Sequence, residues 1–301
     1  YQLFSPLLYQ VATGGLPEDD IAYPIRAAIP GVKYLRGELI KINESENNIT
    51  LKDQTSIDFE YLVLATGSTG NTFGIPGVKE NTLQMKTIAE ARAIKYRLLN
   101  MYEEIEAGHK PKDSLKVIVV GAGPTGVEIS GAVAELQKSM KHEFPDIYKH
   151  ASVTLVEAGP RVLPMFKEKS SMHAQNELEE IGVTVKTNSE VDRMYESTVH
   201  LKNGEILMAG TIIWAAGVAA HSEWSKIGEA DRSNRIIVDE YLRSKPNIFV
   251  IGDGAHFKLD GKPLPMVAPV AMQMGRHVAK QILNLKNNKD LMKFKYKDKG
   301  Q

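Results

Sequence analysis

The chain has 301 residues, of which 43% are hydrophobic and 25% charged, so it can bury a substantial core and form about two globular domains. Basic and acidic residues balance at 37 each, so the net charge gives no reason to expect a nucleic-acid partner. The sequence contains no cysteine, which excludes disulfides, thiolate metal sites and every mechanism that needs a redox-active cysteine pair or a cysteine nucleophile.

Membrane and export signals are not visible in the sequence. No run approaches the roughly 20 uninterrupted apolar residues of a membrane-spanning helix, and the first residues lack the pattern of a signal peptide. The chain as given is therefore expected to be soluble and cytoplasmic.

Short apolar runs alternate with helical stretches along the chain. Each run has the residues of a buried strand followed by small residues or glycine: YLVLATG (61–67), KVIVVGAG (116–123), SVTLVEAG (152–159), TIIWAAG (211–217) and NIFVIGDG (247–254). This alternation predicts an α/β protein with largely parallel sheets, and ligands are expected at the carboxyl ends of the strands.

Two stretches between the runs, 87–100 and 171–180, have the apolar spacing of amphipathic helices and are interpreted as packing elements. Residues 107–114, AGHKPKDS, combine glycine, proline and mixed charge, which is typical of a linker before a new domain.

The central motif is a glycine loop. Gly121, Gly123 and Gly126 have GxGxxG spacing, directly after a strand and at the start of an apolar helix, a context that favours a dinucleotide-binding loop over a purely structural turn. The first glycine permits the tight turn, the second lets the backbone approach a diphosphate, and the third permits close packing of helix on strand. The diphosphate is expected at the helix amino terminus, beside Pro124 and Thr125.

The strand at 152–156 is followed by Glu157, where an acidic residue accepts hydrogen bonds from an adenosine ribose. This carboxylate favours NADH over NADPH, whose phosphate it repels. Arg161 could soften the preference, although an exposed arginine is more often just a solvated charge.

An internal repeat explains why the glycine loop lies in the middle of the chain. Residues 58–68, DFEYLVLATGS, and 208–218, MAGTIIWAAGV, both contain an apolar strand that ends in a small-residue turn with a glycine. They indicate two related halves, and the glycine loop of the first half would lie before Tyr1. We therefore expect a fragment that lacks its first βαβ unit.

The last strand ends in Gly252, Asp253 and Gly254. A carboxylate there is suited to hydrogen-bond the ribityl chain of FAD, and an ordinary Asp-Gly turn is the alternative. Together with the strand at 61–67, this turn indicates a flavin partner.

The chain resembles the type II NADH:quinone oxidoreductases, single-subunit respiratory NADH dehydrogenases among the two-dinucleotide-domain flavoprotein reductases. The resemblance is carried, in the family's order, by FSPLLYQVATGGL, IAYPIR, YLVLATGS, GAGPTGVE, IGDGAHF and FKYKDKG. It implies an α/β fold with two Rossmann-like domains, in which the NADH domain is inserted into a discontinuous and incomplete FAD domain. The expected boundaries are 1–110 for the first FAD part and linker, 111–220 for the NADH domain, and 221–301 for the second FAD part and the start of the carboxyl-terminal region.

The resemblance also implies site residues. Glu128 matches a catalytic glutamate near the nicotinamide and flavin, with a dipole-favoured glutamate in the first helical turn as the alternative. Gly217 should approach the nicotinamide, and Thr66 and Gly67 the FAD, together with Gly252 and Asp253.

A quinone motif of the form AQxAxQQ falls on residues 268–274, APVAMQM, beginning at Ala268. Gln273 is retained, whereas Pro269 and Met274 replace the other two glutamines, which puts the pocket shape or the acceptor in doubt. Met272 and Met274 would make the pocket more apolar, and a Gln273 that only bonds to backbone is the alternative.

The tail, KFKYKDK at 293–299, is expected to be a sheet strand with its lysines in solvent, with contact to anionic lipid as the less favoured reading. In the family a membrane-anchoring region follows, so the full-length protein would lie peripherally on the inner face of the cell membrane. The histidines have no metal-ligand spacing, so no metal is expected, and His173, His256 and His277 are expected at the surface or in packing.

The expected function is transfer of electrons from NADH through FAD to a membrane quinone, without proton pumping. Two alternatives stay open: an NADH-binding module that is inactive because the FAD diphosphate loop is missing, and an NADH-dependent reductase of a soluble acceptor. NADH, quinone and, in the full-length protein, the membrane surface are the expected partners, and the resemblance makes a homodimer plausible.

Overall fold

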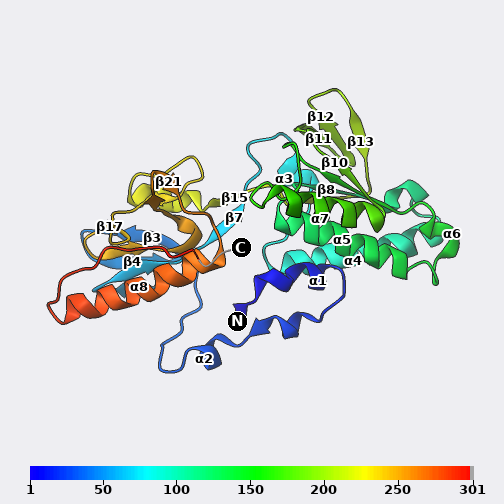
Figure 1. Cartoon of the computed structure of the whole chain (residues 1–301). Coiled ribbons are helices and arrows are strands. Elements are labelled where there is room, and N and C mark those ends of the chain that lie inside the picture. Colours follow the sequence, from blue (N-terminus) through cyan, green and yellow to red (C-terminus); the bar gives the residue numbers. More distant parts are fainter. Residues whose placement is uncertain (299–301) are drawn as a thin grey trace. The chain divides into compact units, whose positions relative to one another are not determined.

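The structure is a computed structural model, and it describes residues 1–298, with the side chains of 225 and 226 left aside. The chain divides into two compact units, each made of two segments (Figure 1). The first unit contains residues 1–32 and 70–217, and the second contains residues 33–69 and the chain from 218 onward.

A parallel sheet forms the centre of the first unit, with the strand order β10-β9-β8-β14. Its members are β8 (Lys116–Val120), β9 (Ser152–Val156), β10 (Val183–Lys186) and β14 (Thr211–Trp214). Val120 lies opposite both Val156 and Trp214, so three strands reach their carboxyl ends at the same level. The predicted strands and their parallel arrangement are confirmed.

Both faces of this sheet are covered, which explains why its strands are continuous apolar runs rather than alternating ones. Val117 and Val119 of β8 pack into one cluster, and Ile118 and Val120 pack into another on the opposite face. The first cluster includes side chains of α1 (Leu8–Ala12), α4 (Ile88–Glu106), α5 (Pro124–Ser139) and α7 (Glu168–Glu180). The second includes an antiparallel sheet of β11 (Val191–Tyr195), β12 (Thr198–Leu201) and β13 (Ile206–Met208), so the unit has three layers (Figure 1).

The predicted helix at 87–100 is confirmed and continues to Glu106. Thr87 and Glu90 form a reciprocal capping box at its start. The added turns bury Tyr102 and Ile105 against Leu115 and Phe144, a contact that lies outside the periodic stretch. The helix predicted at 171–180 begins at Glu168.

Residues 107–114, predicted as a linker between domains, connect α4 to β8 inside the first unit. Residues 1–32 and 70–110 also belong to this unit, whereas the sequence grouped all of 1–110 with the FAD domain. The physical reason is packing, because α1 and α4 contact each other, and α1 also contacts α5.

The shorter elements of the first unit are η1 (Ser5–Leu7), η2 (Glu18–Asp20), η3 (Lys112–Leu115), β1 (Gln2–Leu3), β2 (Ala22–Tyr23), α2 (Ile25–Ala28), α3 (Val78–Asn81) and α6 (Pro145–Tyr148). Strand β7 (Ser68–Gly70) pairs with β15 (Val218–Ala220). A glycine in the left-handed region precedes each of these two strands, at Gly67 and Gly217, as the predicted repeat requires.

In the second unit, β6 (Leu62–Leu64) pairs in parallel with β18 (Ile248–Val250), and β17 (Arg243–Lys245) pairs antiparallel with β18. The other elements are β3 (Leu39–Asn43), β4 (Asn48–Leu51), β5 (Ser56–Asp58), η4 (Ser222–Ile227), β16 (Ile236–Ile237), η5 (Gly252–Gly254), β19 (Ala255–His256), β20 (Lys258–Leu259), β21 (Lys262–Pro263) and α8 (Ala268–Lys286). No described helix is both long and apolar enough to cross a bilayer.

The tail is not a strand over the described residues, so that prediction is wrong; Lys299 and Gly300 lie outside them. Two glutamines of α8 hold the tail instead. Gln273 donates to Lys297 O and accepts from Lys297 N, and Gln281 forms the same two bonds with Met292. Phe294 is buried between them, against His277. Side-chain amides, together with one backbone bond from Phe294 N to Glu240 O, thus take the place of a neighbouring strand.

We predict that Gln281→Leu lowers the free energy of unfolding by about 2 to 3 kcal/mol, because it removes both hydrogen bonds that the buried Gln281 amide makes to the Met292 backbone. Gln281 itself is fully buried. Urea denaturation followed by circular dichroism measures the change. The control, Gln273→Leu, should cost less than about 1 kcal/mol, because water replaces bonds at that exposed contact. Equal losses in the two variants would contradict this assignment.

Candidate functional site

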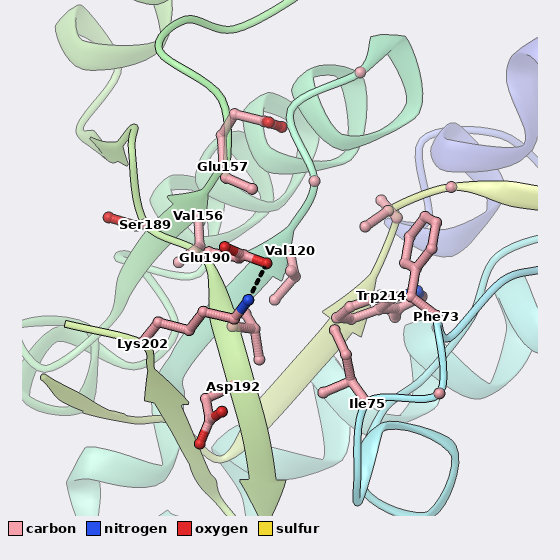
Figure 2. A pocket seen from close by; sticks show the side chains of 18 of the residues that line it. Phe73, Ile75, Val120, Val156, Glu157, Ser189, Glu190, Asp192, Lys202 and Trp214 are labelled. Carbon is pink, nitrogen blue, oxygen red and sulfur yellow. Dashed lines mark hydrogen bonds and ion pairs between the residues drawn. The ribbon is translucent and has the colours of Figure 1, made fainter. Parts of the chain in front are cut away.

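A cavity of about 660 Å³ opens at the carboxyl ends of β8, β9 and β14 in the first unit. Four of the residues predicted for NADH line it: Gly121, Gly123, Glu157 and Gly217. Pro124 and Thr125 are exposed in the first turn of α5, and Gly126 is buried behind them. The structure therefore brings the glycine loop, the acidic residue and the end of β14 to one pocket (Figure 2).

The three loop glycines are required for different reasons. Gly121 has φ +98°, and a Cβ on it would lie 2.6 Å from Cα of Ala216. A Cβ on Gly126 would lie 1.7 Å from the carbonyl oxygen of Gly121, where helix meets strand. A Cβ on Gly123 would meet no protein atom within 4 Å. Packing thus requires glycine at 121 and 126, whereas the space beside Gly123 is open and can hold a ligand.

Glu157 is fixed by the loop that it faces. Its Oε2 accepts a hydrogen bond from Ala122 N, and its Oε1 accepts one from Gly159 N, both at 2.7 Å. Each carboxylate oxygen has a further lone pair, so Glu157 can also accept from ribose hydroxyls.

Arg161 does not offer its charge to the pocket. Its guanidinium donates to the carbonyl oxygens of Pro164 and Phe166 and to the hydroxyl of Ser171. It therefore stabilises the loop between β9 and α7. The structure gives Arg161 neither of the two expected roles: it is not a cation that softens the nucleotide preference, and it is not a free solvated charge.

One wall of the cavity carries charges that the sequence did not reveal. Lys202 Nζ pairs with Glu190 Oε1 at 2.5 Å, with Asp192 and Ser189 nearby (Figure 2). Asp192 lies in β11, Ser189 and Glu190 lie in the segment before it, and Lys202 lies in the turn after β12. Ser189 N donates to Glu157 O. Neither strand has a motif, so only their place in the tertiary structure identifies them.

The opposite wall is apolar, with Phe73, Ile75 and Trp214 (Figure 2). Phe73 and Ile75 belong to the loop 70–76, which the sequence analysis did not select. A Gly-Ile-Pro sequence after a strand was the available signal, but it is typical of loops in general.

Glu128 lies elsewhere. It lines a second cavity of about 590 Å³, beside Tyr9, Gln10 and Thr13 of the α1 region and Glu135 of α5. Its carboxyl is open to solvent on one side, and partial desolvation by the cavity walls raises its pKa above the usual glutamate value. The structure does not bring this predicted catalytic residue into the glycine-loop pocket.

The residues predicted for FAD come together in the second unit. The parallel pairing of β6 and β18 places the turns after both strands at one edge, and Ser68 Oγ donates to Asp253 Oδ2 at 2.6 Å. Gly67 and Gly252, both with φ +68°, form these turns, and Thr66 is exposed beside them. Within the described residues, Oδ1 of Asp253 accepts no hydrogen bond, so it can accept one from a ribityl hydroxyl. The free acceptor and the two glycine turns fit the ribityl part of a flavin.

Neither of the residues predicted for quinone, Ala268 and Gln273, lines either of the two cavities described above. Ala268 is exposed at the start of α8, and the amide of Gln273 bonds to the Lys297 backbone. Met274 is 1% exposed, and its sulfur accepts from Gly252 N, so it is a core residue. Met272 is exposed.

The three histidines have different surroundings. His173 is exposed beside Glu177, and burial lowers the pKa of His277, which packs against Phe294. His256 is buried, with Nδ1 2.6 Å from Asp231 Oδ2. Burial opposes ionisation of Asp231, but hydrogen bonds from His256 and Arg235 lower its pKa overall. No group of three or more possible metal ligands occurs in the described residues.

Comparison with known proteins identifies the family. A family model described as pyridine nucleotide-disulphide oxidoreductase matches residues 4–275. The chain is 33% identical to the type II NADH:quinone oxidoreductase of Staphylococcus haemolyticus, over 100% of this chain and 77% of that protein. It is 32% identical, with the same coverage, to the one of Staphylococcus aureus. The chain belongs to the type II NADH:quinone oxidoreductase family.

Solved structures agree with this assignment. NDH2 from Plasmodium falciparum in complex with NADH matches with a TM-score of 0.78 and 28% identity, over 84% of this chain and 57% of that chain. A ferredoxin reductase from Rhodopseudomonas palustris, at 20% identity and a TM-score of 0.77, covers 98% of this chain and 69% of its own and shares the fold. The predicted family and fold class are confirmed. The family is one of oxidoreductase enzymes, and it indicates FAD and NADH as cofactors.

We predict that Gly126→Ala lowers the free energy of unfolding by about 3 kcal/mol, because the new methyl group overlaps the Gly121 carbonyl. Gly123→Ala should change it by no more than about 1 kcal/mol. The same Gly123→Ala variant should bind NADH about tenfold more weakly, because its methyl group points into the cavity. Urea denaturation and titration calorimetry measure the two effects. A stable Gly126→Ala variant, or full binding by Gly123→Ala, would refute the roles given to these glycines.

Proposed function

We propose that the chain binds NADH in the glycine-loop pocket and FAD in the second unit, and that it passes electrons from NADH to a quinone without pumping protons. The observation that carries the proposal is the pocket at the ends of β8, β9 and β14, which Gly123 leaves open. FAD, when bound, would accept a hydride from the nicotinamide and pass electrons on one or two at a time.

The proposal also gives NADH a direction in the pocket. The diphosphate lies on the amino terminus of α5, where free N–H groups and the helix dipole favour an anion. In this fold the adenosine half lies over the second strand, which is β9, beside Glu157. The nicotinamide half then points toward the end of β14, where Gly217 and the apolar wall are.

The charges favour NADH over NADPH. Glu157, Glu190 and Asp192 line the adenosine end, with Lys202 paired to one of them. A ribose phosphate would enter a region with excess negative charge. Arg161, which could have offset this, is bonded to its own loop.

In the second unit, the FAD role is proposed for Thr66, Gly67, Gly252 and Asp253. Asp253 holds Ser68 with one oxygen and offers the other. The glycines let the backbone approach a ligand without a side chain in the way. The domain assignment, with an NADH domain between two parts of an FAD domain, is part of this proposal.

Quinone is proposed as the acceptor because the two Staphylococcus relatives are NADH:quinone oxidoreductases. Peripheral attachment to the inner face of the cell membrane and a homodimer are proposed from the resemblance to this family. A soluble acceptor is the second candidate, favoured by one observation: Gln273 is already bonded to the backbone of Lys297 and Met274 is buried. Activity compared between a short-chain quinone and ferricyanide distinguishes these acceptors.

The proposal is tested by the visible spectrum of the purified chain after free flavin has been removed. NADH is then added anaerobically and the spectrum is recorded again. A flavin band that bleaches supports it. A colourless protein that binds NADH would reduce the chain to an NADH-binding module. A flavin band that NADH leaves unchanged would refute NADH as the electron donor. Two variants serve as controls: Asp253→Ala should lose the flavin and keep NADH binding, and Gly123→Ala should keep the flavin and need more NADH to bleach.

We predict that Glu157→Gln weakens NADH binding by about tenfold, because a neutral amide replaces a charged acceptor. The preference for NADH over NADPH should shrink at the same time, because the repulsion of the ribose phosphate falls. Titration calorimetry with both nucleotides measures this. The control is Glu135→Gln, which removes a charge from α5 outside the pocket. An unchanged NADH to NADPH ratio in Glu157→Gln would show that another group sets the preference.

A further inference from the structure

The loop 70–76 carries a strained aromatic residue at the edge of the glycine-loop pocket. Phe73 has φ +52°, a left-handed conformation that bulky side chains rarely adopt, and Gly74 after it has φ +70°. Strain of this kind persists only where the surrounding structure holds it, and it occurs often at ligand clamps.

Burial does not explain the strain. The side chain of Phe73 is 61% exposed and belongs to none of the hydrophobic clusters of its unit. Its ring lies directly on Gly217, where a Cβ would be 2.3 Å from the ring Cζ. The ring therefore needs a glycine beneath it, and it lines the cavity while most of its surface stays exposed (Figure 2).

The loop is fastened to the end of β14 by one residue, Asn71. Its backbone N donates to Gly217 O at 3.3 Å, and its carbonyl oxygen accepts from Trp214 Nε1 at 2.9 Å. Its side-chain Oδ1 accepts from Phe73 N at 2.8 Å. The backbone of Phe73 is thereby fixed relative to Gly217, so the position of the ring is set by the strand end and not by a free loop.

We infer that Phe73 is a positioning residue for the nicotinamide half of NADH, with its ring packed against the nicotinamide. This inference rests on the proposed function, in which the nicotinamide lies toward the end of β14. An aromatic ring fixed at that end offers the flat, polarisable surface that a nicotinamide ring packs against. The adenosine half lies at Glu157 and does not meet this ring.

Paired binding measurements test the inference, with NADH and with ADP-ribose, which has the same adenosine diphosphate but no nicotinamide. Phe73→Ala should bind NADH about five- to tenfold more weakly, and its affinity for ADP-ribose should stay within about twofold of the wild type. Phe73→Tyr, which keeps the ring, should bind NADH as the wild type does. Calorimetry measures both ligands on the full chain.

Phe73→Gly separates positioning from stability. Glycine adopts a positive φ without strain, so this variant should melt at or above the wild-type temperature and still show the selective loss of NADH affinity. A structural role for the ring would instead lower the melting temperature.

Equal losses for NADH and ADP-ribose, or no loss for either, would overturn the role of Phe73 while leaving the pocket assignment intact. A wild-type chain that binds neither ligand would refute the proposed function, and the role of Phe73 with it.

Discussion

The start of α5 packs so closely on the end of β8 that a single added carbon on Gly126 would lie 1.7 Å from the Gly121 carbonyl oxygen. This contact lets the helix begin directly at the strand end. It therefore aims the amino terminus of α5 at the space beyond β8, and the loop carrying Gly123 turns over that space. Glu157 then bonds to Ala122, which fixes the adjacent strand end to the same loop. The pocket is thus a consequence of how closely one helix and one strand pack.

The two ends of the pocket differ in chemistry because they are built from different parts of the chain. The end near β9 carries carboxylates and a paired lysine, supplied partly by an antiparallel sheet that covers the opposite face of the parallel one. The end near β14 carries aromatic and aliphatic side chains, supplied by a loop fastened through Asn71. A molecule with a polar sugar half and a flat, less polar ring half suits this asymmetry. In the proposed NADH site, selectivity between such molecules would depend on the layers around the sheet, and the glycine loop would supply the diphosphate site.

Local sequence patterns were enough to predict the strands, the glycine loop and Glu157, because each depends on residues close together in the chain. Ends of elements were less accurate: α4 continues past Asn100 because Tyr102 and Ile105 meet Phe144, a contact distant in sequence. The charged wall and Phe73 were missed for the same reason. The tail was predicted as a strand from its alternating residues, but side chains of α8 bond to it instead. Alternating residue types do not determine which groups the backbone of a segment bonds to.

The two glutamines of α8 recognise the tail through its peptide groups. Gln273 and Gln281 each donate to one carbonyl and accept from one N–H, and neither bond involves a side chain of the tail. Nearly any amino acid could therefore stand at 292 or 297, with proline excluded because it has no N–H. Among related proteins, such an arrangement would appear as invariant glutamines facing a segment of drifting sequence, a pattern that a search for co-varying residue pairs would not detect.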